Sequence, residues 1–143
     1  MNEVCMLDFD TARRLADEVL AQGRVLDCAP LAVAVVDPSG TPLVLFRTDG
    51  APPMWGRIAQ AKARTALDFG RSTAQVQGMV RDHPDLMRAI APLSEEPVIA
   101  AAGGIVVRHK GRIVGAIGVS GDTSENDAAC ARHAAELLGF EGM

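Results

Sequence analysis

The stretch IVVRHKGRIVGAIGV at residues 105–119 decides the fold. It contains two apolar runs, Ile105–His109 and Arg112–Val119, which are separated only by Lys110 and Gly111. A two-residue connection of this kind is typical of a β-hairpin, in which neighbouring strands run in opposite directions. The stretch therefore predicts an antiparallel pair of strands in the second half of the chain.

A second hairpin is predicted upstream. Leu31–Val36 is an unbroken apolar run that indicates a buried strand, and Leu43–Thr48 follows it as a partner. The DPSG sequence at 37–40 between them has the residues of a β-turn, with Asp first and Pro second. Two hairpins favour an antiparallel sheet of about five strands flanked by helices over a Rossmann-type parallel sheet.

Apolar residues recurring near the helical period predict helices at 11–29, 55–69 and 124–138, and shorter ones near 74–81 and 85–91. Asp10 or Thr11 is expected to cap the first helix, and Pro30 to end it. The predicted fold class is α/β of the α+β type, in the order α-β-β-α-(α)-β-β-α. Since no repeat or linker divides the chain, we expect one domain over 1–143 with its core at about 11–138.

Composition excludes several kinds of protein. The 143 residues carry 14 basic and 18 acidic side chains, a formal net charge of −4, and only five aromatic residues. A nucleic-acid surface needs a basic face and stacking rings, so this class is not expected. Uncharged stretches are too short, or too rich in Gly and Pro, to span a membrane. The first residues show no basic region before an apolar run, so we expect no secretory signal and a cytoplasmic location.

The three cysteines, Cys5, Cys28 and Cys130, are widely scattered and lack the spacing of a zinc site. We expect them to be reduced thiols that pack as small apolar side chains. The histidines also lack a metal-binding spacing, so no metal site is predicted.

Lys62 is the most informative residue of the helix predicted at 55–69. On a helical wheel it falls in the middle of the apolar arc that contains Trp55, Ile58 and Ala66. An ammonium there must reach solvent or find an acidic partner, because burying it unpaired is costly. Alternatively, Lys62 binds a carboxylate or a haem propionate, or acts as a desolvated base.

Asp127 creates the same conflict on the apolar face of the last helix. Ser124 and Asp127 have the spacing of a capping box, and an acid in the first turn complements the helix dipole. Asp127 is also a candidate partner for Lys62. The two roles are compatible.

Two other segments contain candidate binding residues. Arg47 and Asp49 follow a predicted strand and precede a rigid Gly/Pro segment, where they line a pocket or form a local surface ion pair. Gly115, Gly118 and Gly121 mark the last strand, and glycines there indicate close approach of another element, a subunit or a flat ligand. Backbone N–H groups from Ser120 onward are candidates for binding an anion at a helix start.

Five segments of the sequence together resemble the GlcG/HbpS family, which includes the C-terminal domain of PduO-type proteins. In chain order they are VVDPSG at 35–40, FRTDGA at 46–51, KARTA at 62–66, GAIGVSG at 115–121, and Asp127 with Ala128 and Ala131. The resemblance extends over about residues 11–138. It implies a single domain with an antiparallel sheet, assembly into homo-oligomers, haem binding in some members and a place in small-molecule catabolism in others.

The resemblance also implies site residues. The family's motif positions fall on Asp37, Arg47, Asp49, Gly50, Lys62, Arg64, Thr65 and Asp127, and Gly103, Gly104 and Ser120 lie near the expected ligand pocket. The family's Gly-Gly-Val-Pro-Ile segment is GGIVV at 103–107 here, without the proline. No strong axial ligand for haem stands out in the sequence.

Two functions follow. The favoured one is a small-molecule-binding protein of a catabolic pathway, an isomerase, hydratase or lyase for an acidic organic or aromatic metabolite. Lys62 and Asp127 would be its catalytic pair, in a pocket at an oligomer interface that also contains Arg47 and Asp49. The alternative is a non-catalytic protein that binds haem or another tetrapyrrole (a corrinoid), with Lys62 or Arg64 holding propionates. Both imply a small anionic ligand and a second copy of the chain as partners.

Overall fold

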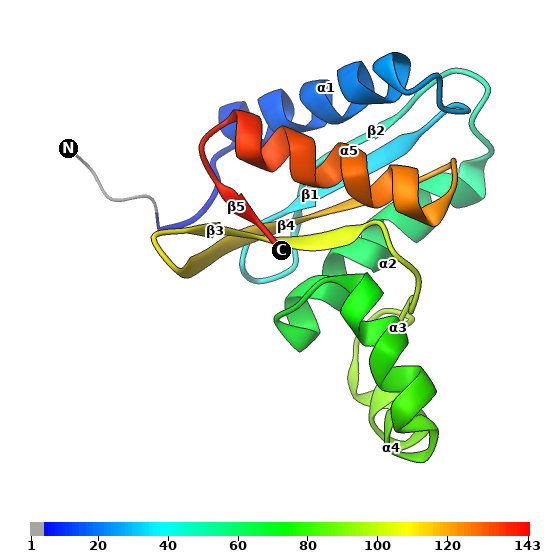
Figure 1. The fold of residues 1–143 in the computed structure, drawn as a ribbon. Coiled ribbons are helices and arrows are strands. Elements are labelled where there is room, and N and C mark those ends of the chain that lie inside the picture. Colours follow the sequence, from blue (N-terminus) through cyan, green and yellow to red (C-terminus); the bar gives the residue numbers. More distant parts are fainter. Residues whose placement is uncertain (1–4) are drawn as a thin grey trace.

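The computed structural model describes residues 5–143, which form a single α+β domain around a five-stranded antiparallel sheet (Figure 1). The strands are β1 Ala32–Val36, β2 Pro42–Arg47, β3 Gly104–His109, β4 Arg112–Ser120 and β5 Glu141–Gly142. The helices are α1 Phe9–Val25, α2 Pro53–Phe69, α3 Thr73–Asp82, α4 Pro84–Ile90 and α5 Ser124–Leu137, with a short 3₁₀ turn η1 at Ala91–Leu93. The strand order is β2-β1-β4-β3-β5.

Both predicted hairpins are confirmed. β1 pairs with β2, β3 pairs with β4, and the two hairpins join through β1 and β4. At the tip of the second hairpin Lys110 and Gly111 have φ values of 52° and 78°, the left-handed conformation that a two-residue turn requires. The sequence does not predict β5, because its two residues are too few to give an alternating pattern; it pairs with β3.

The two faces of the sheet are covered differently. α1 and α5 lie side by side on one face and α2 lies on the other (Figure 1). Larger aliphatic side chains, among them Leu15, Val33 and Ile117, fill the core under α1 and α5. Small residues dominate the contact with α2, where Ala34 meets Ala59 and Ala116 meets Ala63.

Gly118 explains the close contact between α2 and β4. A Cβ at this position would overlap the carbonyl oxygen of Ala59 and lie 2.6 Å from the amide nitrogen of Ala63. The glycine therefore lets the helix backbone rest directly on the sheet. The sequence left open whether another element, a subunit or a flat ligand approaches the glycines of the last strand. At Gly118 it is another element of the same chain, α2.

The caps of two helices differ from the predictions. α1 begins at Phe9, and its N-cap is Asp8, whose carboxylate accepts a hydrogen bond from the amide of Thr11 at 2.8 Å; Asp10 lies in the first turn. The helix ends at Val25, earlier than predicted, since Asp27 turns the chain with a φ of 54°. α5 is capped by Thr123, so the predicted capping box of Ser124 and Asp127 is wrong.

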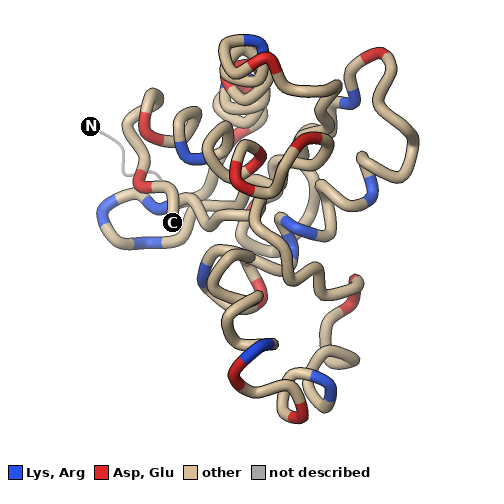
Figure 2. Tube along the Cα trace, turned by 45° about the vertical axis from the view of Figure 1, so that its right-hand side comes forward, with Lys and Arg blue, Asp and Glu red and all other residues tan. Residues whose placement is uncertain are grey.

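α3, α4 and η1 form an arm that projects from the sheet beside α2 (Figure 1). α3 starts with a capping box between Ser72 and Gln75. Figure 2 shows acidic and basic residues close together on this arm, which include the ion pairs of Arg81 with Asp82 and Arg88 with Asp85. Within 5–143, no helix has the length and apolar character needed to cross a membrane. The expectation about the start of the chain falls partly on 1–4, outside the described range.

Candidate functional site

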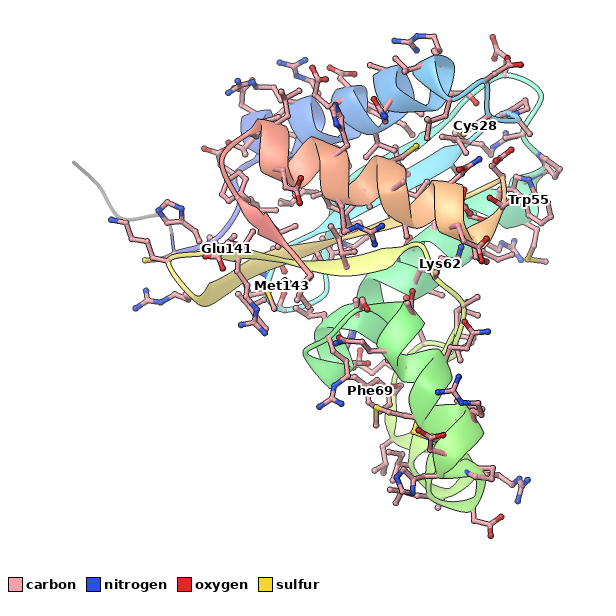
Figure 3. All side chains as sticks on the ribbon, viewed as in Figure 1. Cys28, Trp55, Lys62, Phe69, Glu141 and Met143 are labelled. Carbon is pink, nitrogen blue, oxygen red and sulfur yellow. The ribbon has the colours of Figure 1, made fainter. Side chains whose placement is uncertain are left out.

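Lys62 (labelled in Figure 3) and Asp127 meet at the end of β4, although they come from α2 and α5, helices on opposite faces of the sheet. The Nζ of Lys62 lies 3.4 Å from Oδ2 of Asp127 and donates a hydrogen bond of 2.9 Å to the carbonyl oxygen of Val119. The side chains are only 5% and 2% exposed. The acidic partner considered for Lys62 is therefore present, and neither side chain reaches solvent.

Local backbone geometry makes room for this ion pair. Gly103 has a φ of +131°, and a Cβ there would lie 2.6 Å from Nζ of Lys62 and 2.5 Å from the oxygen of Val119. The second carboxylate oxygen of Asp127 accepts the amide of Asp122 at 3.1 Å. Glycine at 103 is thus required by both conformation and space.

Burial and pairing act against each other on the protonation of the two groups. Removal from water lowers the pKa of Lys62 and raises the pKa of Asp127, since burial disfavours both charged forms. The opposite charge of each partner offsets part of both shifts. The lysine is therefore easier to deprotonate than an exposed lysine.

Thr65, Gly104 and Ser120 have structural roles within the chain. The hydroxyl of Thr65 accepts the amide of Ile99 at 3.0 Å, which ties the segment before β3 to α2. The amide of Gly104 donates to the hydroxyl of Thr73 at 2.9 Å. Ser120 is buried at the end of β4, where it pairs with Ala32.

The other predicted site residues take separate contacts within the chain. Asp37 closes the β1–β2 turn by accepting hydrogen bonds from residues 39 and 41, which lowers its pKa against the effect of partial burial. Arg47 donates to the carbonyl oxygen of Ala51. Asp49 and Gly50 lie exposed on the following loop. Within one chain, the structure thus gathers Lys62, Asp127 and Gly103, but not the first-hairpin residues.

Arg64 lies on the outer side of α2. Its guanidinium pairs with Asp68 at 3.0 Å and with Glu95 at 3.6 Å, and these acids raise its pKa. A Cβ on Gly40 would lie 2.7 Å from the same guanidinium. Arg64 therefore connects α2 to the β1–β2 turn and to the segment after η1.

A groove of about 450 Å³ along α2 is the main feature that sequence reasoning missed. Its apolar lining comes from Met54, Ile58 and Ala61 on α2 and from Pro97 and Ile99 opposite; the polar lining is Arg57, Gln60 and Glu96. The amide of Gln60 donates to the carboxylate of Glu96 at 3.1 Å, which connects the two walls. The opposing wall has no regular secondary structure, so no periodic pattern could place it against the helix.

Metal-ligating side chains do not gather in the described part of the chain. Across residues 5–143 there is no group of three or more His, Cys, Asp or Glu side chains positioned to hold a metal ion. The candidate features are therefore the buried ion pair and the α2 groove.

Comparison with known proteins places these features in context. The chain is 27% identical over 136 residues to an uncharacterized 15.0 kDa protein from the dhaT-dhaS intergenic region of Citrobacter freundii, covering 95% of this chain and 94% of that one. It is 38% identical over 90 residues to protein GlcG of Escherichia coli, covering 63% of each chain. It is 27% identical to the corrinoid adenosyltransferase PduO of Salmonella typhimurium over 90% of this chain but only 38% of PduO.

Solved structures share the fold. The crystal structure of a PduOC:heme complex superimposes with a TM-score of 0.84 at 25% identity, covering 94% of this chain and 96% of that one. The crystal structure of HbpS superimposes with a TM-score of 0.83 at 29% identity, covering 97% and 94%. A family model described as haem degrading protein HbpS-like matches residues 7–136. The chain therefore belongs to the HbpS-like family.

Proposed function

We propose that this protein binds haem or a related tetrapyrrole, and that the α2 groove is where it binds. The observation that carries this proposal is the groove itself: an apolar trough with one guanidinium, Arg57, in its lining. The relationship to HbpS and the likeness to a PduOC:heme complex support the choice of ligand. The comparisons support haem binding better than the catabolic enzyme favoured from sequence.

The residues of the groove fit the chemistry of this ligand. A porphyrin has an apolar face and two carboxylates, and small-molecule sites commonly combine apolar walls with a few polar groups. Ile58, Ala61 and Ile99 offer the apolar contact. Arg57 offers a bidentate partner for a carboxylate, and Met54 offers a sulfur donor to iron. Bound haem would supply a redox-active iron, which this chain's own side chains do not provide.

Lys62 is poorly placed to hold a propionate, which is one of the roles that the sequence left open for it. Its side chain is only 5% exposed, and its ammonium already contacts Asp127 and the carbonyl oxygen of Val119. A propionate would have to displace these contacts. Arg57 lies in the groove lining and is exposed, so it can meet a carboxylate without breaking the core.

A haem titration of the purified apo-protein tests the proposal. We expect a saturable Soret shift at one haem per chain. Arg57→Ala should weaken binding about 10-fold to 100-fold, the loss of one charge-assisted hydrogen bond. Arg14→Ala, on the exposed side of α1, is the matched control and should bind as the wild type does. Absence of a stoichiometric shift in the wild type would refute haem binding, and an unchanged affinity of Arg57→Ala would place the haem elsewhere.

The catalytic role of Lys62 and Asp127 remains a second proposal. The observation in its favour is the lowered pKa of Lys62, which a general base for an acidic organic or aromatic metabolite would need. The chain has two lysines, so the exposed Lys110 serves as an internal control for amine labelling read by mass spectrometry. Labelling of native Lys62 at least as fast as Lys110 supports a reactive amine. Labelling only after unfolding contradicts it.

Homo-oligomer formation and a cytoplasmic location also remain proposals. β2 is an edge strand of the sheet, and Leu45 on it is 46% exposed. An exposed edge with an apolar side chain favours contact with another chain. Light scattering during size-exclusion chromatography should give a mass of at least twice the 15.0 kDa of one chain. The monomer mass at micromolar concentration would contradict the proposal.

A further inference from the structure

We propose that the thioether of Met54 is an axial ligand of the haem iron, an inference that rests on the haem-binding function proposed above. Met54 is the second residue of α2 and follows two prolines, which fix the start of the helix. Its side chain is 52% exposed and lines the groove. A ligand entering the groove can therefore meet the sulfur atom without any rearrangement of the core.

The position of Met54 along the helix matches the apolar floor of the groove. Ile58 and Ala61 are four and seven residues further on, so all three lie on one stripe of α2. At 1.5 Å per residue the stripe is about 10 Å long. The sulfur thus lies at one end of a continuous apolar surface, and Arg57 lies one turn along it.

The chemistry of the remaining groove residues points to the same atom. Arg57 is a cation, and the carboxylate of Glu96 already accepts a hydrogen bond from Gln60. Pro97, Ile99, Ile58 and Ala61 have no donor side chain. Met54 is therefore the soft donor among the groove residues, and thioethers are established haem ligands in proteins.

The imidazole and thiol groups of the described residues lie elsewhere in the fold. His83 lies between α3 and α4, and His109 packs edge-on against Phe140. Cys130 is on α5 and points into the core between that helix and the sheet, where it is buried. None of the three histidines and three cysteines is among the residues that line the α2 groove, so a haem held there takes its protein ligand from another residue type.

Spectroscopy of the ferric complex tests the assignment. Met54→Leu keeps the volume and apolar character of the groove, and Met54→His replaces the thioether by an imidazole. With imidazole added to supply the second iron ligand, which the groove residues do not provide, we expect the wild-type complex to show the weak near-infrared charge-transfer band of low-spin, thioether-ligated ferric haem. Met54→Leu should lose this band while its Kd for haem rises less than 10-fold. Met54→His should show an imidazole-type spectrum and a lower reduction potential.

Met79→Leu is the matched control, since this methionine lies on α3 outside the groove lining. It should keep the band. A wild-type complex without the band, or Met54→Leu with the band intact, would overturn the ligand assignment and leave haem binding in place. If Met54→Leu loses all haem binding, recovery by Met54→His supports ligation and failure to recover overturns it. No haem binding by the wild type would overturn the proposed function itself.

Discussion

Removing one member of the Lys62–Asp127 pair should be far more damaging than removing both. At 3.4 Å and an effective dielectric constant of about 20, the two charges attract each other by about 5 kcal/mol. Both also lost their hydration on folding, so much of this attraction only compensates for burial. A single substitution leaves the other charge buried without its partner.

We expect Lys62→Met and Asp127→Leu each to lower the free energy of unfolding by about 3–5 kcal/mol. The double variant replaces the pair by apolar side chains of similar size and should lose only about 2 kcal/mol, mainly the hydrogen bonds to Val119 and Asp122. Independent effects would instead add to about 6–10 kcal/mol. The difference is large enough to resolve in a double-mutant cycle.

Urea unfolding followed by circular dichroism measures the cycle. Arg88→Met is the control, because Arg88 and Asp85 form an exposed i, i+3 pair at 3.1 Å whose loss should cost less than about 1 kcal/mol. If a single variant does not fold, recovery of folding in the double variant carries the same information. The reasoning is refuted if the single variants resemble the control, or if the double variant loses the full sum.

Three further predictions concern other parts of the fold. Hydrogen bonds from the backbone and from a neighbouring amide lower the pKa of Asp122 from 3.8 to about 2. Its carboxylate therefore stabilises the folded state above pH 3.8, and this contribution is lost as the pH falls toward 2. Asp122→Asn should flatten that part of the curve of unfolding free energy against pH, measured by urea titration. Gly118→Ala should destabilise the fold by about 1–3 kcal/mol or more, because the added Cβ overlaps α2, whereas Gly78→Ala inside α3 should stabilise it by about 0.5–1 kcal/mol. Thermal unfolding measures both, and equal shifts in Tm would contradict the prediction. Burial raises the pKa of Cys130 to about 12, so iodoacetamide should label the exposed Cys5 and spare Cys130 until the protein unfolds, as mass spectrometry of the native protein can check.

The sheet could be predicted because its signals are local. The Lys110-Gly111 turn and the Leu31–Val36 run each specify their own structure within a few residues, and the strands follow the predicted bounds within one residue. The caps were harder, since Asp8, Asp10 and Thr11 are all suitable capping residues and only the observed hydrogen bond distinguishes them. Helix starts are therefore decided by geometry that composition does not contain.

Part of the candidate site could likewise be predicted from local sequence, and part could not. Lys62 and Asp127 were identifiable because a charge on an apolar helix face needs a partner, and each face was visible in its own helix. The groove was not identifiable, because its second wall is the irregular segment around Pro97 and Ile99, which lies against α2 only through tertiary contacts such as that of Thr65. For the same reason the sequence does not predict a role for Met54, which becomes a candidate only through the groove that it lines.

Through the ion pair, α2 connects the groove on one face of the sheet to α5 on the other face. α2 presents Met54 and Arg57 to the groove on one side and Lys62 to Asp127 on the other, and Asp127 belongs to the first turn of α5 across the sheet. A ligand that moves α2 away from the sheet would lengthen the Lys62–Asp127 ion pair. A ligand that holds α2 in place would stabilise that ion pair. Occupancy of the groove should therefore be detectable as slower amide hydrogen exchange at the start of α5, on the face of the sheet that the ligand never touches.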